Sequence, residues 1–215
     1  MPETISPHPD ARQAPRVVLG LGNPGERYAA TRHNVGFRVV EELARRRDLE
    51  LLASECNALI AAEGRLALAA PQTYMNRSGH AARCLQERRG VLSEDFLVVY
   101  DEIHLPLGTL RLRRRGSPAG HRGMESVLES LGTDEVPRLR LGIAGSGGPP
   151  PGDDLVDYVL EPFSEDEREL VEAMIRRAAD ACDTWIDEGV DAAMQRFNGP
   201  LLSADAAAPN STDID

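Results

Sequence analysis

The feature that most constrains this chain is a glycine-rich turn directly after an apolar run, in the segment RVVLGLGNPGERYAATRHNVGF at residues 16–37. Gly20, Gly22 and Gly25 match the G-x-G-x-x-G spacing of a dinucleotide-binding turn. That fingerprint needs a helix that opens at the third glycine, so that its backbone N–H groups can hold a pyrophosphate. Here the following residues are polar and lack helical periodicity. The segment therefore predicts a strand and then a turn that presents side chains rather than a cofactor.

The composition favours one soluble domain. A chain of 215 residues with 41% apolar residues is long enough for one substantial core. We expect this domain at 16–199, between disordered tails at 1–15 and 200–215 that are rich in Pro, Ala, Ser and Asp. Without an apolar run of membrane-spanning length or a signal peptide, the protein is expected in the cytoplasm. Cys56, Cys84 and Cys182 match neither a disulfide framework nor a C-x-x-C metal site, so we expect buried thiols.

The net charge of -11 is distributed unevenly along the chain. Residues 153–191 contain fourteen acidic residues against three arginines, whereas residues 16–152 contain nineteen arginines against sixteen acidic residues. The chain has no lysine, so every basic side chain of this part is a guanidinium, which suits phosphate oxygens and surface ion pairs alike. The overall negative charge therefore does not exclude a nucleic-acid partner.

The apolar periodicity predicts strands that alternate with helices. We expect strands at 16–21, 58–62, 65–70, 96–100, 109–115 and 139–144, and helices at 35–47, 78–89, 122–131 and 164–188. Asn34 is expected to cap the first helix. This alternation predicts an α/β fold, with a single-domain, mixed and mostly parallel sheet flanked by helices in three α/β/α layers. Its functional site should lie at the carboxyl ends of the strands.

Three polar residues each follow an apolar run: Asn23, Asn76 and Asp101. On neighbouring strands they would converge at one end of the sheet, within reach of His33. A histidine beside a carboxylate is a general-base pair, because the carboxylate fixes the tautomer and stabilises the imidazolium. A strand-end aspartate is also commonly a cap or turn residue, and the residues alone leave both interpretations open.

Five separated motifs carry a family resemblance: GLGNPGERYAATRHNVGF, PQTYMNRSG, VVYDEIHLPLGTLRLR, AGHRGMES and RLRLGIAG. Their order and spacing resemble those of the bacterial-type peptidyl-tRNA hydrolases. The resemblance implies hydrolysis of the ester between a peptide, or an N-blocked aminoacyl group, and the 3'-terminal ribose of tRNA, which frees the tRNA for translation. It implies His33 as the general base for water and Asp101 as its supporting carboxylate, with no metal or cofactor. A monomer without membrane or obligate protein partners is expected.

The resemblance also assigns residues that contact the substrate. It places Asn23 with the catalytic pair and Asn76 in the substrate site, where their amides can pair with the N–H and C=O of a peptide bond. It implies that Tyr28 and Tyr74 contact the acceptor end of the tRNA and that Met75 forms a wall of the peptide site.

Arginines provide the candidate surface for the tRNA backbone. In TLRLRRR at 109–115, strand alternation places Arg111, Arg113 and Arg115 on one face, about 6.6 Å apart. Charge that protects an exposed edge strand is the alternative explanation. Arg140 is a second candidate, with a structural ion pair as its alternative. Arg122 stands where the family usually has Asn. Because arginine accepts no hydrogen bond, any acceptor role of that Asn is lost, and a phosphate contact or a repositioned water could take its place.

Two other functions fit parts of the sequence. A metal-dependent hydrolase could use His33, Asp101, His104 and His121, although their spacing matches no recognised zinc motif. We interpret His104 as a surface residue and His121 as a loop or helix-start residue. An RNA-binding protein of the same fold that has lost hydrolysis is the alternative from a different functional class.

Overall fold

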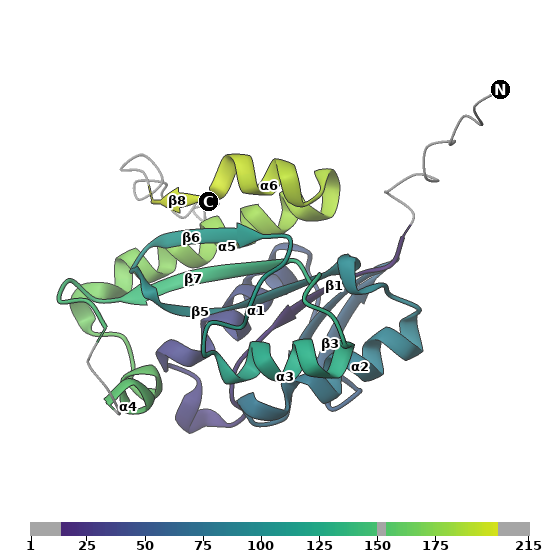
Figure 1. Ribbon diagram of the computed structural model, residues 1–215, viewed down its shortest axis with the longest axis horizontal. Helices are drawn as coiled ribbons and strands as arrows, with labels where there is room; N and C mark the ends of the chain where they lie inside the picture. The colour runs from purple at the N-terminus through teal and green to yellow at the C-terminus, as the bar shows by residue number, and fades with distance from the viewer. Residues whose placement is uncertain (1–13, 150–153, 202–215) are drawn as a thin grey trace, which may run out of the picture.

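The computed structural model describes residues 14–149 and 154–201, so most of the two predicted tails lies outside the described residues. One sheet has the strand order β2-β3-β4-β1-β5-β7-β6-β8 (Figure 1). The strands are β1 (Arg16–Gly20), β2 (Ala53–Glu55), β3 (Ala58–Glu63), β4 (Leu66–Pro71), β5 (Phe96–Pro106), β6 (Thr109–Arg113), β7 (Arg138–Ala144) and β8 (Gly199–Pro200). The central strands β4, β1, β5 and β7 run parallel, and the outer pairs are antiparallel. The predicted mixed, mostly parallel sheet is confirmed.

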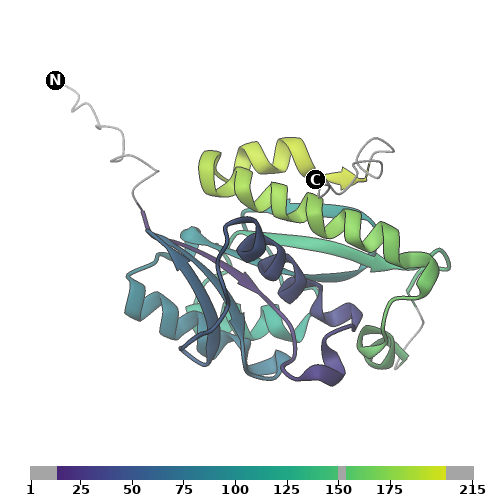
Figure 2. The same cartoon turned by 180° about the vertical axis from the view of Figure 1, so that it is seen from behind.

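Helices cover both faces of the sheet. They are α1 (Val35–Arg46), α2 (Ser78–Arg89), α3 (Arg122–Leu131), α4 (Asp154–Leu160), α5 (Arg168–Glu188) and α6 (Val190–Phe197). Single 3-10 turns are η1 (Glu26–Tyr28), η2 (Arg32–Asn34), η3 (Met75–Arg77), η4 (Ser93–Asp95) and η5 (Glu165–Glu167). Figure 1 shows α2 and α3 in front of the sheet, and Figure 2 shows α1 and α5 on the other face. No described helix is long and apolar enough to span a membrane.

Alternation along the strands supplies a core to each of the two faces. Val18 of β1 packs in the cluster that contains α1 and α5, whereas Val17 and Leu19 pack in the cluster that contains α2 and α3. On β6, Leu110 and Leu112 are fully buried toward α5 and α6. The predicted three-layer α/β/α arrangement follows from these two cores.

Two glycines of the opening segment allow close packing rather than a turn. A Cβ atom on Gly20 would lie 2.2 Å from the carbonyl oxygen of Gly36, and one on Gly36 would lie 2.4 Å from that of Val99. The first turn of α1 therefore packs directly on the backbones of β1 and β5. Among the glycines of residues 16–37, only Gly25 has the positive φ, 103°, that favours glycine.

The expected thiols at Cys56 and Cys84 are a wrong prediction, because these residues form a disulfide. Their 28-residue separation along the chain concealed a Cα–Cα distance of 5.4 Å, which the fold creates by packing the β2–β3 turn on α2. Cys182 is a buried free thiol, as predicted, and burial raises its pKa.

Several element predictions need correction. The strand predicted at 96–100 continues to Pro106, so Asp101 lies within β5 and not beyond its end. The strand predicted at 109–115 ends at Arg113, and Arg115 instead pairs with Glu135. Helices α4 and α6 and strands β2 and β8 were not predicted; β8 pairs with β6, so β6 is not an edge strand. The Asn34 side chain does not cap α1.

The disulfide should stabilise the fold measurably. Closing a 28-residue separation removes entropy from the unfolded chain, so Cys84→Ser should lower the free energy of unfolding by about 2–4 kcal/mol. Dithiothreitol should lower the stability of the wild type to the same level in chemical denaturation and leave Cys84→Ser unchanged. A wild type whose stability ignores the reductant would contradict the bond.

Candidate active site

A cavity of about 460 Å³ lies beyond the carboxyl ends of β1 and β4 and beside the second half of β5. The predicted residues that line it are Asn23, His33, Tyr74, Met75, Asn76, Asp101 and Arg122. Helix α4 adds an apolar wall through Leu155, Val156, Val159 and Leu160. The cavity thus brings polar groups from four separate sequence motifs together with an apolar surface.

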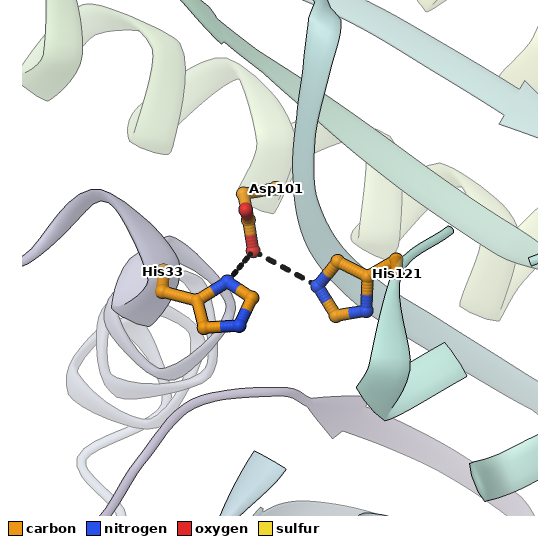
Figure 3. A group of neighbouring side chains, drawn as sticks. All are labelled: His33, Asp101 and His121. Atoms are coloured by element: carbon orange, nitrogen blue, oxygen red, sulfur yellow. Dashed lines mark hydrogen bonds and ion pairs between the residues drawn. The ribbon is translucent and has the colours of Figure 1, made fainter. Parts of the chain in front are cut away.

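The centre of the cavity is a carboxylate that binds two histidines (Figure 3). Oδ1 of Asp101 lies 2.8 Å from Nδ1 of His33 and 3.0 Å from Nε2 of His121. Asp101 comes from β5, His33 from η2, and His121 from the residue that precedes α3. The Asp101 carboxylate is buried, with a side-chain exposure of 2%.

The hydrogen-bond partners determine which nitrogen of each histidine carries a proton. Nδ1 of His121 accepts the backbone N–H of Met124 at 3.1 Å and thereby caps α3. That nitrogen has no proton when the ring is neutral, so Nε2 is the donor to Asp101. His33 likewise donates its Nδ1–H to the carboxylate, which leaves Nε2 of His33 unprotonated. Figure 3 shows this nitrogen on the side of the ring away from Asp101.

Burial and charge shift both titrating groups of the central pair. Burial disfavours the imidazolium of His33, but the charge of Asp101 and the hydrogen bond to it outweigh burial, so the pKa of His33 is raised. Burial also disfavours the Asp101 carboxylate, but the two facing histidines outweigh it, and the pKa of Asp101 lies well below its ordinary value. The pair therefore combines a permanent carboxylate with a more basic imidazole.

The neighbours of His33 in sequence anchor it on both sides. Arg32 is buried, forms a 2.7 Å ion pair with Glu167, and lies over the rings of Tyr158 and Phe163. Asn34, on the other side, hydrogen-bonds to the backbone of Asn23. Because both anchors are long-range contacts, no local sequence pattern indicated them.

The side-chain amide oxygen of Asn23 is already hydrogen-bonded within the protein. Its Oδ1 accepts the backbone N–H of Met75 at 2.8 Å. Its Nδ2 is therefore the group available to a ligand in the cavity, as a hydrogen-bond donor. The expectation that Asn23 offers both its amide oxygen and its amide NH2 to a peptide bond is thereby narrowed to the NH2 group. Asn76 lines the same cavity and is exposed.

The residues considered for a metal site are only partly brought together. His33, Asp101 and His121 place candidate ligand atoms within 4.8 Å of one another, whereas His104 is exposed and outside this group. A metal on Nε2 of His121 would require a proton on its Nδ1, which would then face the N–H of Met124. The donor set therefore suits hydrogen bonding better than metal coordination.

His121 is the central residue that the sequence reasoning left outside the site. It was interpreted as a loop or helix-start residue, and it is indeed the N-cap of α3, but its Nε2 also contacts Asp101. The available signal was its position directly before a predicted helix at the same sheet end. That signal does not give the direction of the side chain.

Four predicted contact residues lie outside the cavity lining. Tyr28 stacks under the guanidinium of Arg27, with 4.5 Å between guanidinium and ring centroid. Arg140 forms a 2.9 Å ion pair with Glu102, which was its alternative explanation. Arg111 and Arg113 occupy β6, away from the cavity lining.

Comparison with known proteins identifies the family. The model of the peptidyl-tRNA hydrolase family matches residues 17–206. The chain belongs to the peptidyl-tRNA hydrolase family. A peptidyl-tRNA hydrolase of Methylacidiphilum infernorum is 45% identical over 85% of this chain and 97% of the relative. One from Roseiflexus sp. is 48% identical over 86% of each chain.

Solved structures agree with this family. The crystal structure of peptidyl-tRNA hydrolase from Acinetobacter baumannii is 28% identical, with a TM-score of 0.77 over 85% of this chain and 95% of that one. Its Arg119Gln mutant is 31% identical, with a TM-score of 0.79 over 86% and 95%. The chain is therefore a peptidyl-tRNA hydrolase in fold and activity, and its substrate is peptidyl-tRNA.

The His33–Asp101 pair should be visible in a titration. In the wild type, the pKa of His33 measured by NMR should lie above the ordinary value of about 6.5. In Asp101→Asn the charge is lost while burial remains, so the pKa should fall below that value. Asp95→Asn, at the opposite end of β5, is the control and should leave His33 unchanged. Equal pKa values in Asp101→Asn and wild type would contradict the coupling.

Proposed function

We propose that His33 is the general base of the hydrolysis and that Asp101 and His121 fix its tautomer. The observation that carries this proposal is the double hydrogen bond on Oδ1 of Asp101, which leaves Nε2 of His33 unprotonated. Nε2 takes a proton from water as the water oxygen attacks the ester carbonyl. The imidazolium then returns the proton to the 3'-oxygen of the ribose as the ester bond breaks. The products are a free carboxylate on the peptide, after loss of its proton, and tRNA with a hydroxyl.

Two asparagines are proposed to recognise the acyl group. Nδ2 of Asn23 is a donor for the ester carbonyl, whose oxygen becomes negative in the tetrahedral intermediate. Neither the amide oxygen nor the amide NH2 of Asn76 bonds to a described protein group, so both can pair with the adjoining peptide bond. Met75 and the apolar wall of α4 contact the peptide side chains. A free aminoacyl group would bring an ammonium there and leave an amide unsatisfied, at a cost of about 1–3 kcal/mol.

The tRNA backbone is proposed to bind on β6 and β7. Arg111, opposite Arg140 in the strand register, shares with Arg113 the face of the sheet that lacks Leu110 and Leu112. In Figure 1 no described helix lies in front of these strands. Burial and the charges of Arg111 and Arg140 lower the pKa of Arg113. Arg140 already pairs with Glu102, whereas no described carboxylate pairs with Arg111 or Arg113, which supports a phosphate as the ligand of these two guanidinium groups.

Three further residues are proposed at the acceptor end. Arg122 is exposed at the mouth of the cavity and suits a phosphate of the single-stranded 3' terminus. Tyr74 is 57% exposed at the same mouth and offers its ring to a terminal base. Tyr28 lies outside the cavity lining, so we propose only that it contacts the acceptor strand of the tRNA outside the cavity.

The cellular setting follows from the substrate. Peptidyl-tRNA is a product of translation, so we propose that the enzyme acts in the cytoplasm. One chain supplies every residue of the cavity, and we propose that a monomer is sufficient for activity.

Replacing the base should separate hydrolysis from binding. His33→Ala should lower single-turnover hydrolysis of N-acetyl-phenylalanyl-tRNA by about 10²–10⁴-fold, because no other described group replaces Nε2. Binding of the tRNA, measured by filter retention, should stay within about twofold. Wild-type hydrolysis in this variant would exclude His33 as the base, and activity lost after dialysis against a chelator would favour a metal mechanism.

The arginine surface should be sensitive to salt. Arg111→Gln and Arg113→Gln should each weaken tRNA binding and reduce the slope of log affinity against log salt by about 1, since each phosphate contact releases a counterion. Hydrolysis of an N-acylated aminoacyl-adenosine, which lacks the tRNA backbone, should not change. Arg65→Gln, exposed in the β3–β4 turn, is the matched control and should keep the wild-type slope. Unchanged slopes in the β6 variants would exclude this surface.

A further inference from the structure

Asn34 makes a paired contact that the proposed chemistry does not yet use. Its Oδ1 accepts the backbone N–H of Asn23 at 2.9 Å, and its Nδ2 donates to the backbone carbonyl of Asn23 at 2.9 Å. One side chain thus satisfies both backbone groups of a single residue. Asn34 is 2% exposed and Asn23 is 8% exposed, so water does not compete freely for these bonds.

By pairing with the backbone of Asn23, the Asn34 side chain gives up the helix-capping role that its position would allow. Asn34 stands at the N-cap of α1, where asparagine commonly accepts an N–H of the first helical turn. Here its side chain makes no such bond and points across to the turn after β1. A residue at the start of α1, next to His33, therefore holds the loop that carries Asn23.

This contact determines what Asn23 offers to the cavity. Its backbone is held by Asn34, and its side-chain Oδ1 is held by the N–H of Met75, whose side chain also lines the cavity. With backbone and Oδ1 both fixed, Nδ2 of Asn23 has one orientation. Preorganised donors of this kind stabilise a developing oxyanion because they need no rearrangement during the reaction.

From this geometry we infer that Asn34 is a positioning residue, which aims the Asn23 amide at the ester carbonyl. The inference rests on the proposed role of Asn23. Asn34 contacts no reacting atom; it couples the element that carries His33 to the loop that carries the amide donor. Its loss should therefore affect the transition state more than the binding of the substrate.

A double-mutant cycle tests this inference on N-acetyl-phenylalanyl-tRNA. Asn34→Ala should lower kcat by about 10- to 100-fold, with a smaller change in KM, because a misplacement of about 1 Å at a reacting group has this order of effect. In the background of Asn23→Ala the same substitution should cost less than about threefold, since the group that it positions is absent. Asn34→Asp keeps the shape and the acceptor for the Asn23 N–H but sets a carboxylate oxygen against the Asn23 carbonyl, so it should also lower kcat.

The controls separate positioning from a loss of structure. Thr31→Val removes the hydrogen bond from Oγ1 of Thr31 to the carbonyl of Tyr28 in the same loop and should leave kcat unchanged. If Asn34→Ala does not fold, as judged by circular dichroism, the cycle is carried out with Asn34→Asp. Equal losses with and without Asn23 would overturn the inference, as would a folded Asn34 variant with wild-type kcat. Wild-type activity of Asn23→Ala would refute the proposed role of Asn23 itself, whereas an active His33→Ala would refute the proposed base.

Discussion

The arrangement of the site depends on one buried carboxylate oxygen. Oδ1 of Asp101 accepts hydrogen bonds from two imidazoles, His33 and His121. Strands β2 to β6 lie between these two histidines in the sequence. An aspartate with 3% exposure is tolerated in the core of an apolar sheet only because these donors compensate its lost hydration. The same two bonds fix the proton positions on both rings. The two hydrogen bonds on Asp101 thus both stabilise the buried carboxylate and prepare His33 to act as a base.

Much of the fold could be predicted because its elements carry local signals. The bounds predicted for α2 and α3 match the structure, since each helix ends at a glycine, Gly90 or Gly132, in the left-handed conformation. The meeting of His33 with Asp101 followed from parallel strands whose carboxyl ends share one edge. Asp101 was predicted just beyond the end of its strand, but it lies within β5, because the end of an apolar run does not show where the strand ends.

What the sequence did not predict depends on distances between remote residues. The bond between Cys56 and Cys84, the second contact of His121 and the pairing of Asn34 with Asn23 are each made by side chains that a local pattern assigns to another role. Asparagine at a helix start predicts a cap, and a histidine there predicts a loop residue. In both cases the tertiary contact competes with the local one, and only the packed chain determines which is formed.

The close contact at Gly36 makes the site independent of much of the core. Backbone, with no side chain between, joins the start of α1 to Val99 on β5, three residues after His33 and two residues before Asp101. This contact between main-chain atoms helps to set the distance between base and carboxylate, because it leaves no side chain whose size could change it at that point. Substitutions of apolar residues that change size or branching in the two cores should therefore disturb the reactive geometry less than a side chain added at Gly36. Selection on activity should accordingly fall more heavily on Gly20 and Gly36 than on the larger apolar residues around them.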